Sequence, residues 1–235
     1  MFFLLAILLA LTSCFGGTSI KAEDIIKKLE KGESVEMKDA IVEGVLDFSN
    51  IGKPSPVGAA MLEARVKANF FCLRCLFKEK VVAQKNNVRT RFDGNVVFLE
   101  SEFQKDVDFT NAIIYGTVNF TKSVFKENAI FYQLAVWSKD SYFSDITANK
   151  KISFDASSFQ GNLSFLNSKF LDSFSLQEVF VLGILQSSNA DFGGKTDFTM
   201  LKTVNRAIFN YAKFKYEPNF SDIKVERISI GKENP

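Results

Sequence analysis

Two cysteines stand at a spacing that proteins use for redox chemistry and for zinc. Cys72 and Cys75 form a C-x-x-C pair, which is the spacing of thioredoxin-like motifs and of structural zinc ligands. The chain contains no histidine, and nothing else in it supplies metal ligands or the βαβ context of a redox motif. The repeat described below directs both side chains inward. The favoured interpretation is therefore a buried thiol pair, with a disulfide as the alternative in an oxidising compartment.

The remaining sequence offers no other chemistry. Without histidine, the usual acid–base catalyst and the commonest metal ligand are missing. The patterns G-x-x-x-x-G-K-[ST], G-x-G-x-x-G and G-x-S-x-G do not occur, and Asp and Glu are scattered where solvated surface is expected. A net charge of +2 creates no strong field toward nucleic acid. We expect a protein that is not an enzyme, uses no cofactor or metal and binds no nucleic acid.

The third cysteine follows an apolar N-terminal segment. Residues 1–13 contain an apolar run that is shorter than the roughly 20 residues needed to span a bilayer and suits a signal-peptide core. The string Leu-Thr-Ser-Cys that ends at Cys14 resembles a bacterial lipobox, which implies cleavage before Cys14 and lipid attachment to its thiol. No Lys or Arg precedes the apolar run, so plain secretion and an uncleaved anchor remain alternatives. Phe15 after the cysteine favours the outer membrane, by analogy with enterobacterial sorting.

Phenylalanine recurs along the chain with an 11-residue period. From Phe92 onward the spacing alternates between six and five residues, and 17 of 24 centres are Phe. A second, smaller residue stands two places before each centre, as Val107 stands before Phe109. Residues two apart in an extended segment share a face, so each unit directs one large and one small residue inward. Such short units bury their apolar sides only by stacking on copies of themselves, which predicts a solenoid. The centres fall at 92, 98, 103, 109, 114, 120, 125, 131, 136, 143, 148, 154, 159, 165, 170, 176, 181, 187, 192, 198, 203, 209, 214 and 220.

This pattern resembles the pentapeptide-repeat family. The resemblance rests on the central Phe or Leu and on the small residue before it, as in the strings that begin at Phe103 and Phe159, and covers roughly residues 40–222. It implies an all-β fold, a right-handed quadrilateral β-helix with four units per coil, so that each coil is two of these periods long. The 24 centres then give six coils, and Phe residues two periods apart should stack in columns. Ala148, Ser187 and Thr203 break the pattern.

A short α-helix is expected before the solenoid. Residues 22–31 place Ile25, Ile26 and Leu29 on one stripe, with acids early, lysines late and Gly32 as a stop signal. A solenoid needs its ends covered, so this helix is expected to cap the first coil, with a partner or membrane helix as the alternative. The predicted organisation is a signal peptide (1–13), a lipid tether with the capping helix (14–35), the β-helix (36–222) and a C-terminal tail (223–235).

Two features are candidates for partner contact. Trp137, the only tryptophan, follows a centre directly and lies beside a seven-residue step, so it should point partly outward, either packing over this wide corner or contacting a partner. Ile223, Val225, Ile228 and Ile230 alternate near the C-terminus and would leave a strand edge open to an unknown partner or to a homodimer through the C-terminal coil.

The predicted function is a non-catalytic, membrane-tethered lipoprotein. It would be exported to the bacterial cell envelope and anchored through lipid at Cys14, where its solenoid would serve as a rigid protein-interaction or envelope scaffold. Some pentapeptide-repeat proteins resemble DNA and inhibit type II topoisomerases, and such a DNA mimic is the alternative. Lysines along the solenoid, which include Lys122, Lys126 and Lys169, interrupt the acidic stripe that a DNA mimic would need.

Overall fold

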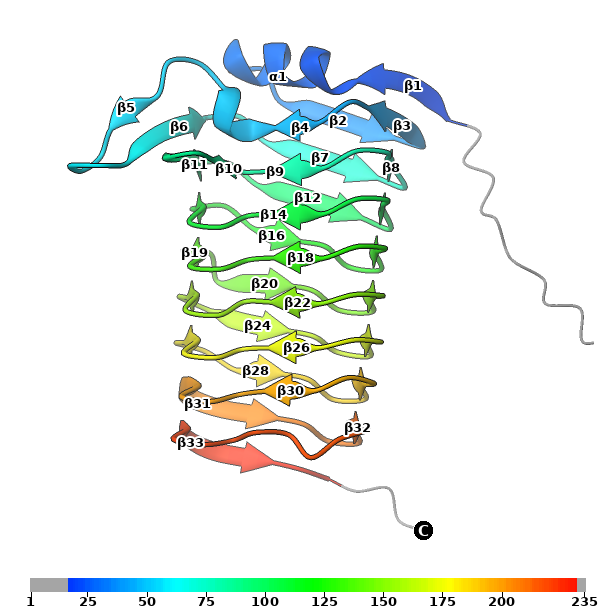
Figure 1. Ribbon diagram of the computed structural model, residues 1–235, viewed down its shortest axis with the longest axis vertical. Helices are drawn as coiled ribbons and strands as arrows, with labels where there is room; N and C mark the ends of the chain where they lie inside the picture. The colour runs from blue at the N-terminus through cyan, green and yellow to red at the C-terminus, as the bar shows by residue number, and fades with distance from the viewer. Residues whose placement is uncertain (1–16, 232–235) are drawn as a thin grey trace, which may run out of the picture.

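The computed structural model describes residues 17–231 as a right-handed parallel β-solenoid with one helix at its N-terminal end (Figure 1). Each coil is a rectangle of four short strands. The four sides are called face 1 to face 4 in the order in which the chain visits them after residue 60. Faces 1 and 3 lie opposite each other, as do faces 2 and 4. The predicted fold class is confirmed.

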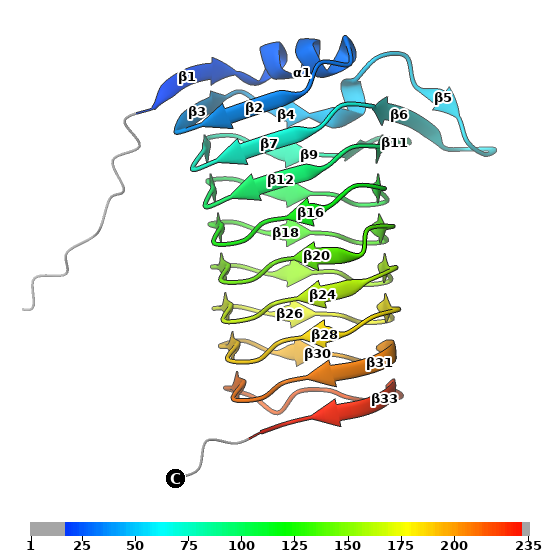
Figure 2. The same cartoon turned by 180° about the vertical axis from the view of Figure 1, so that it is seen from behind.

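The strands of each face stack in register along the solenoid (Figures 1 and 2). Face 1 contains β6 (Leu62–Val66), β11 (Val88–Phe92), β15 (Ile113–Ile114), β19 (Ala135–Val136), β23 (Ser158–Phe159), β27 (Phe180–Val181) and the first parts of β31 (Lys202–Ile208) and β33 (Lys224–Ser229). Face 2 contains β2 (Val35–Lys38), β7 (Phe70–Leu73), β12 (Val96–Leu99), β16 (Val118–Asn119), β20 (Asp140–Tyr142), β24 (Asn162–Ser164), β28 (Leu185–Gln186) and the second parts of β31 and β33.

The other two faces complete the rectangle. Face 3 contains β1 (Thr18–Lys21), β3 (Ala40–Glu43), β8 (Leu76–Phe77), β13 (Glu102–Phe103), β17 (Val124–Phe125), β21 (Thr147–Ala148), β25 (Lys169–Phe170), β29 (Asp191–Phe192) and β32 (Lys213–Phe214). Face 4 contains β4 (Leu46–Asp47), β9 (Val81–Val82), β14 (Val107–Asp108), β18 (Ala129–Ile130), β22 (Ile152–Ser153), β26 (Phe174–Ser175) and β30 (Thr196–Asp197).

The register confirms the period predicted from phenylalanine. Phe103 pairs with Phe125, which stands two periods later. Phe125 pairs with Ala148, and this step is longer by one because the wide corner before Phe143 adds a residue. The predicted columns exist inside the coils. Phe131 stacks on Phe154 with ring centroids 4.6 Å apart and an interplanar angle of 5°. Such offset stacking adds to the stabilisation that burial provides.

The three breaks in the pattern still point inward. Ala148, Ser187 and Thr203 are all buried, and the residues two places earlier, Ile146, Leu185 and Leu201, are large and buried as well. Each of these units therefore exchanges the positions of its large and small side chains. Because the summed volume is kept, the core stays filled where Phe is missing.

Left-handed residues set the corners of the coils. Phe109 O accepts a hydrogen bond from Ala112 N at 3.1 Å, and Asn111 between them has φ +57°. A positive φ at the third residue is the mark of a type II turn, which favours Gly or Asn. The same conformation recurs once in every period, with one longer interval at the wide corner, at Glu100, Asn111, Lys122, Gln133, Asp145, Ala156, Asn167, Glu178, Asn189, Met200, Tyr211 and Asp222.

Both ends of the solenoid differ from the expected organisation. Helix α1 (Ala22–Glu30) buries Ala22, Ile25 and Leu29 against the first coil, as predicted. β1, which lies in the expected tether, pairs in parallel with β3. β33, which lies in the expected tail, pairs in parallel with β31. β1 buries few side chains and joins its sheet through backbone pairing, which the side-chain repeat does not signal, whereas Ile223 and Val225 at β33 pack against the core.

A hairpin arm projects from face 1 at the N-terminal end (Figure 1). After a 3-10 turn, η1 (Phe48–Asn50), β5 (Ser55–Pro56) pairs antiparallel with β6. Beneath it, β10 (Gln84–Lys85) pairs antiparallel with β11. β6 and β11 continue from this arm into the parallel sheet of face 1. β10 and β11 therefore form a second hairpin, with its turn at residues 86–87.

Candidate interaction surface

Trp137 is half-exposed and stacks on another aromatic residue. It directly follows β19, where Val136 points inward, so its indole points outward and is 54% exposed. Its ring lies 6.0 Å from that of Tyr115 at an interplanar angle of 12°. The guanidinium of Arg91 lies 4.4 Å from the centre of the Tyr115 ring, within the range of a cation–π contact. Arg91 pairs with Ile113 and so stands before its inward centre, whereas Tyr115 and Trp137 follow theirs. Through the reach of the guanidinium, the three side chains form one line of contacts over three successive coils of face 1.

These three residues belong to a longer surface on the same face that is apolar except at β23, where the outward residues are Ser158 and Gln160. Between β15 and β27, the outward positions on either side of each inward centre carry no charge. Tyr115, Trp137, Leu182 and Val204 are among the exposed large hydrophobic residues. We call this surface the apolar stripe, which consists of Ile113, Tyr115, Ala135, Trp137, Phe180, Leu182 and Val204.

An ion-pair cluster borders the stripe at its N-terminal end. Asp93 accepts hydrogen bonds from Arg65 at 2.5 Å and from Arg91 at 2.8 Å, and Arg89 lies 2.9 Å from Glu63. Partial burial raises the pKa of Asp93, but the hydrogen bonds from Arg91 and Arg65 outweigh it and leave the pKa below its ordinary value of 3.8. Three arginines face two carboxylates, so this end of the stripe is net positive.

Lysines border the stripe at its C-terminal end. Lys202 and Lys224 occupy paired outward positions on β31 and β33. Both are exposed. Glu226 on β33 is the acidic residue beside them, so two lysines stand against one carboxylate at this end. The apolar stripe therefore lies between two basic borders.

The four residues predicted at the C-terminal edge lie on or beside β33. Ile223 and Val225 are half-buried against the last coil. Ile228 aligns with the inward Ala207 and is 38% exposed, while Ile230 is 54% exposed. These side chains continue the inward columns and are exposed because no further coil covers them among residues 17–231. Within that range, β33 pairs only with β31, so its other edge is open.

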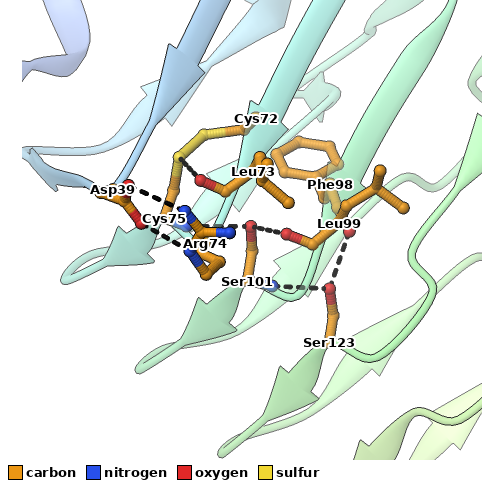
Figure 3. Close-up of a disulfide and its surroundings, with 9 residues drawn as sticks. All are labelled: Asp39, Cys72, Leu73, Arg74, Cys75, Phe98, Leu99, Ser101 and Ser123. Carbon is orange, nitrogen blue, oxygen red and sulfur yellow. Dashed lines mark hydrogen bonds and ion pairs between the residues drawn. A yellow bond between two sulfur atoms is a disulfide. The ribbon is translucent and has the colours of Figure 1, made fainter. Parts of the chain in front are cut away.

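The cysteine pair is a buried disulfide (Figure 3). Cys72 and Cys75 flank a corner and are both fully buried. Because their sulfur atoms are bonded to each other, the favoured interpretation as free thiols is wrong. Between them, Arg74 takes a left-handed conformation with φ +52° and donates two hydrogen bonds to Asp39, at 2.6 and 2.9 Å. The Ser101 hydroxyl accepts the Cys75 N–H at 3.2 Å. This arrangement fixes the corner and shields the sulfur atoms.

Sequence reasoning found Trp137 but missed the rest of the stripe. Tyr115, Leu182 and Val204 stand directly after inward centres, as Trp137 does, and all lie in one series on face 1, which Gln160 interrupts on the coil of β23. This shared place in the repeat is the signal that could have found them. Cys14, the predicted lipidation site, lies outside the described residues. Between residues 17 and 231 no three or more Cys, Asp or Glu side chains are grouped to hold a metal ion, and no helix is long and apolar enough to cross a membrane.

Comparisons with known proteins agree with this architecture. Residues 88–133 match the family model described as pentapeptide repeats (9 copies). A search of the curated proteins and a search of the solved structures give no match. The matched repeat and the parallel β-solenoid around it are consistent with a pentapeptide-repeat β-helix. This solenoid class is generally non-catalytic and fits a structural or interaction scaffold.

Proposed function

We propose that this protein is a non-catalytic scaffold that is tethered to a bacterial envelope membrane by lipid on Cys14 and binds other proteins through its outer faces. The apolar stripe is the observation that carries the proposal. Large apolar side chains on a soluble surface are stabilised when a partner covers them, and Trp, Tyr and Arg are the residues enriched at binding hot spots. The stripe and its adjoining arginine bring all three into one line of contacts.

A solenoid of this construction suits a rigid scaffold. The inward Phe residues of the central coils are fully buried, and each coil is hydrogen-bonded to the next on every face. Buried serines add further bonds between coils. Ser123, for example, donates to Phe98 O at 2.8 Å and accepts the Ser101 N–H at 3.1 Å. A surface supported in this way keeps its shape when a partner binds, which reduces the entropic cost of association.

The proposed tether rests on the sequence around Cys14. The disulfide supports an exported protein, because disulfides persist in oxidising compartments. Cys14 stands three positions before Gly17, and such a segment spans at most about 10 Å. A lipid on Cys14 would therefore hold the N-terminal coil close to the bilayer.

Fractionation of cells fed a labelled fatty acid tests the tether. The wild-type protein should carry label and sediment with membranes, while Cys14→Ala should lose the label and become soluble. The double variant Cys72→Ala/Cys75→Ala is the matched control, since it removes the other two cysteines and should keep both the label and the membrane location. Retention of Cys14→Ala in the membrane fraction would contradict the tether.

Self-association through the C-terminal coil is a second part of the proposal. The open edge of β33 and the exposed Ile228 and Ile230 allow two copies to pair edge to edge around a twofold axis. Light scattering of the soluble Cys14→Ala form should give a mass that rises with concentration toward a dimer. Adding Ile228→Lys should hold it at the monomer mass. A Cys14→Ala mass that stays monomeric at all concentrations would remove this part.

The DNA-mimic alternative has no comparable support on the described surface. Lys122 lies 3.7 Å from Glu100, and Lys126 lies 3.8 Å from Glu102. Lysines therefore neutralise these two acids, which do not contribute to a continuous acidic stripe. A phosphate-backbone mimic needs such a stripe.

A further inference from the structure

We propose that the apolar stripe binds a segment of a partner protein that carries a row of apolar side chains between acidic residues. This inference rests on the proposed scaffold function and names the chemistry of its partner. It is carried by the kinds of side chain that the four faces present, by the size of the stripe and by the basic residues at its two ends.

Over the coils from β15 to β27, large apolar side chains occupy most of the outward positions beside the inward centres of face 1 but few of those on the other three faces. Face 2 carries no charge at these positions either, but most of its residues there are Asn, Thr, Ser and Gln. At equivalent outward positions, face 4 carries Asp108, Asp155 and Asp197, and face 3 carries Lys126 and Lys169. On face 1 the same positions from β15 to β27 hold only neutral residues, most of them large and apolar. Because the coils repeat, no demand of the fold distinguishes these faces. The composition of face 1 therefore points to contact with another apolar surface.

The stripe has the dimensions of one secondary-structure element. It runs from β15 to β31 across four coil-to-coil steps, which at about 4.8 Å each give about 19 Å. An α-helix of about 13 residues has this length. The hairpin arm projects from the same face at its N-terminal end (Figures 1 and 2) and limits how far a partner can extend in that direction.

The basic residues at both ends of the stripe favour a partner segment that carries acidic residues on both sides of its apolar row. The arginine cluster at one end has an excess of positive charge over Glu63 and Asp93, and Lys202 and Lys224 lie at the other end. Acidic residues on either side of the partner's apolar row would pair with both borders. A second copy of this chain fits poorly, because an antiparallel, twofold pairing of two stripes would place the arginine cluster of each copy against the lysines of the other.

A lipid surface is the competing occupant, and the geometry disfavours it. β1, the first strand after Cys14, lies on face 3, directly across the coil from face 1 (Figure 1). A tether of about 10 Å at this position brings face 3 or the capped end of the solenoid to the bilayer. Face 1 then points away from the membrane in the first case and stands perpendicular to it in the second, so in neither case does it lie against the lipid.

Site-specific photocrosslinking in cells that produce the full chain tests the inference. A photoreactive amino acid replaces Gln160, a neutral residue between Trp137 and Leu182 on face 1, and the crosslinked peptide is sequenced by mass spectrometry. The expected product is one protein segment with apolar residues at helical or strand spacing and acids on both sides. The matched control position is Gln177, exposed on face 4, which should give no such product.

Substitutions then test whether the stripe itself binds. Trp137→Ala should reduce the crosslink from position 160 at least tenfold, with a thermal midpoint within about 2 °C of wild type because the side chain is half-exposed. A synthetic peptide with the crosslinked sequence should bind Lys202→Glu several-fold more weakly than wild type. It should bind Lys213→Glu, on the opposite face, as wild type does.

The outcomes separate this inference from the tether. Crosslinks to lipid, crosslinks to a second copy, equal products from position 177, or no product from position 160 would each overturn it. The crosslink is also measured in the soluble Cys14→Ala variant with the peptide added. If the peptide is captured there but the wild-type protein carries no lipid, the docking surface stands and the tether falls.

Discussion

Replacing Phe131 by alanine should lower the free energy of unfolding by about 3–5 kcal/mol. The ring is fully buried and lies between Phe154, at 4.6 Å, and Phe109, at 5.8 Å, in its own column. Phe120 and Phe143 meet it edge-on at 5.6 and 5.2 Å. Few side chains in the solenoid have more aromatic neighbours. The variant therefore tests the inward register directly.

The magnitude follows from two contributions. Removing the benzyl group forfeits about 1.5–3 kcal/mol of transfer free energy. A residual cavity of about 80 Å³, at about 24 cal/mol per Å³, adds about 2 kcal/mol. Collapse of the site is restricted because Phe131 N donates to Ser153 O at 2.7 Å, which fixes the coil to its neighbour.

Urea unfolding, followed by far-UV circular dichroism and by the fluorescence of Trp137, provides the assay. Trp137 is the only tryptophan and lies close to Phe131 in the chain, so agreement of the two probes tests whether the coil unfolds with the whole solenoid. The control is Tyr132→Ala, which removes the adjacent but 42% exposed aromatic ring and should cost at most about 1 kcal/mol. A larger loss for Tyr132 than for Phe131, or a loss below about 1 kcal/mol for Phe131, would refute the register.

Three further predictions concern corners, the disulfide and acid. Glu178→Asn should stabilise the protein by about 0.5–1 kcal/mol, because Asn tolerates the left-handed conformation of this corner. Glu178→Val should instead lower the urea midpoint. Equal urea midpoints for the two variants would argue against strain at the corner. Cys72→Ala/Cys75→Ala should cost about 2 kcal/mol, the loop-entropy estimate for so short a loop, and an unchanged urea midpoint would contradict this. The hydrogen bond from Arg74 lowers the pKa of Asp39 below its ordinary 3.8. The stabilisation that this ion pair gives the folded protein is therefore fully present above pH 3.8 and is lost as the pH falls through the lowered pKa. With no histidine in the chain, thermal midpoints should vary little between about pH 5 and pH 8 and fall in acid; a marked change within that neutral range would contradict this account.

The inward half of the fold could be predicted from the sequence because large and small residues alternate within units of fixed length. Once Phe143 sets the register after the wide corner, the inward direction of a residue as small as Ala148 follows from its position alone. The packing at the breaks is also encoded, since Ile146 stands two places before Ala148. A search for Phe alone misses this packing, because the large side chain occupies the other inward position of the same unit.

Other parts of the fold carry no side-chain signal of the same kind. β1 joins the sheet through backbone pairing with β3, and only Ile20 of its four side chains is partly buried. The hairpin arm interrupts the repeat with antiparallel strands. The sequence leaves the state of Cys72 and Cys75 open because inward positions suit thiols and a disulfide equally well. In each case, the deciding interaction is a backbone contact or a covalent bond that composition does not report.

The outer surface follows a different rule from the core, and this rule explains why the candidate site is only partly visible in the sequence. Each inward side chain must pack on its equivalents in the neighbouring coils, so these positions follow the repeat. Outward positions are free to differ from coil to coil. A functional surface on a solenoid therefore consists of unlike residues on successive coils, such as Arg91, Tyr115 and Trp137, whose side chains are in contact although 24 and 22 residues of sequence separate them. No local motif links them. They become neighbours only when the coil length is known, so the site depends on the core register even though none of its members belongs to the core.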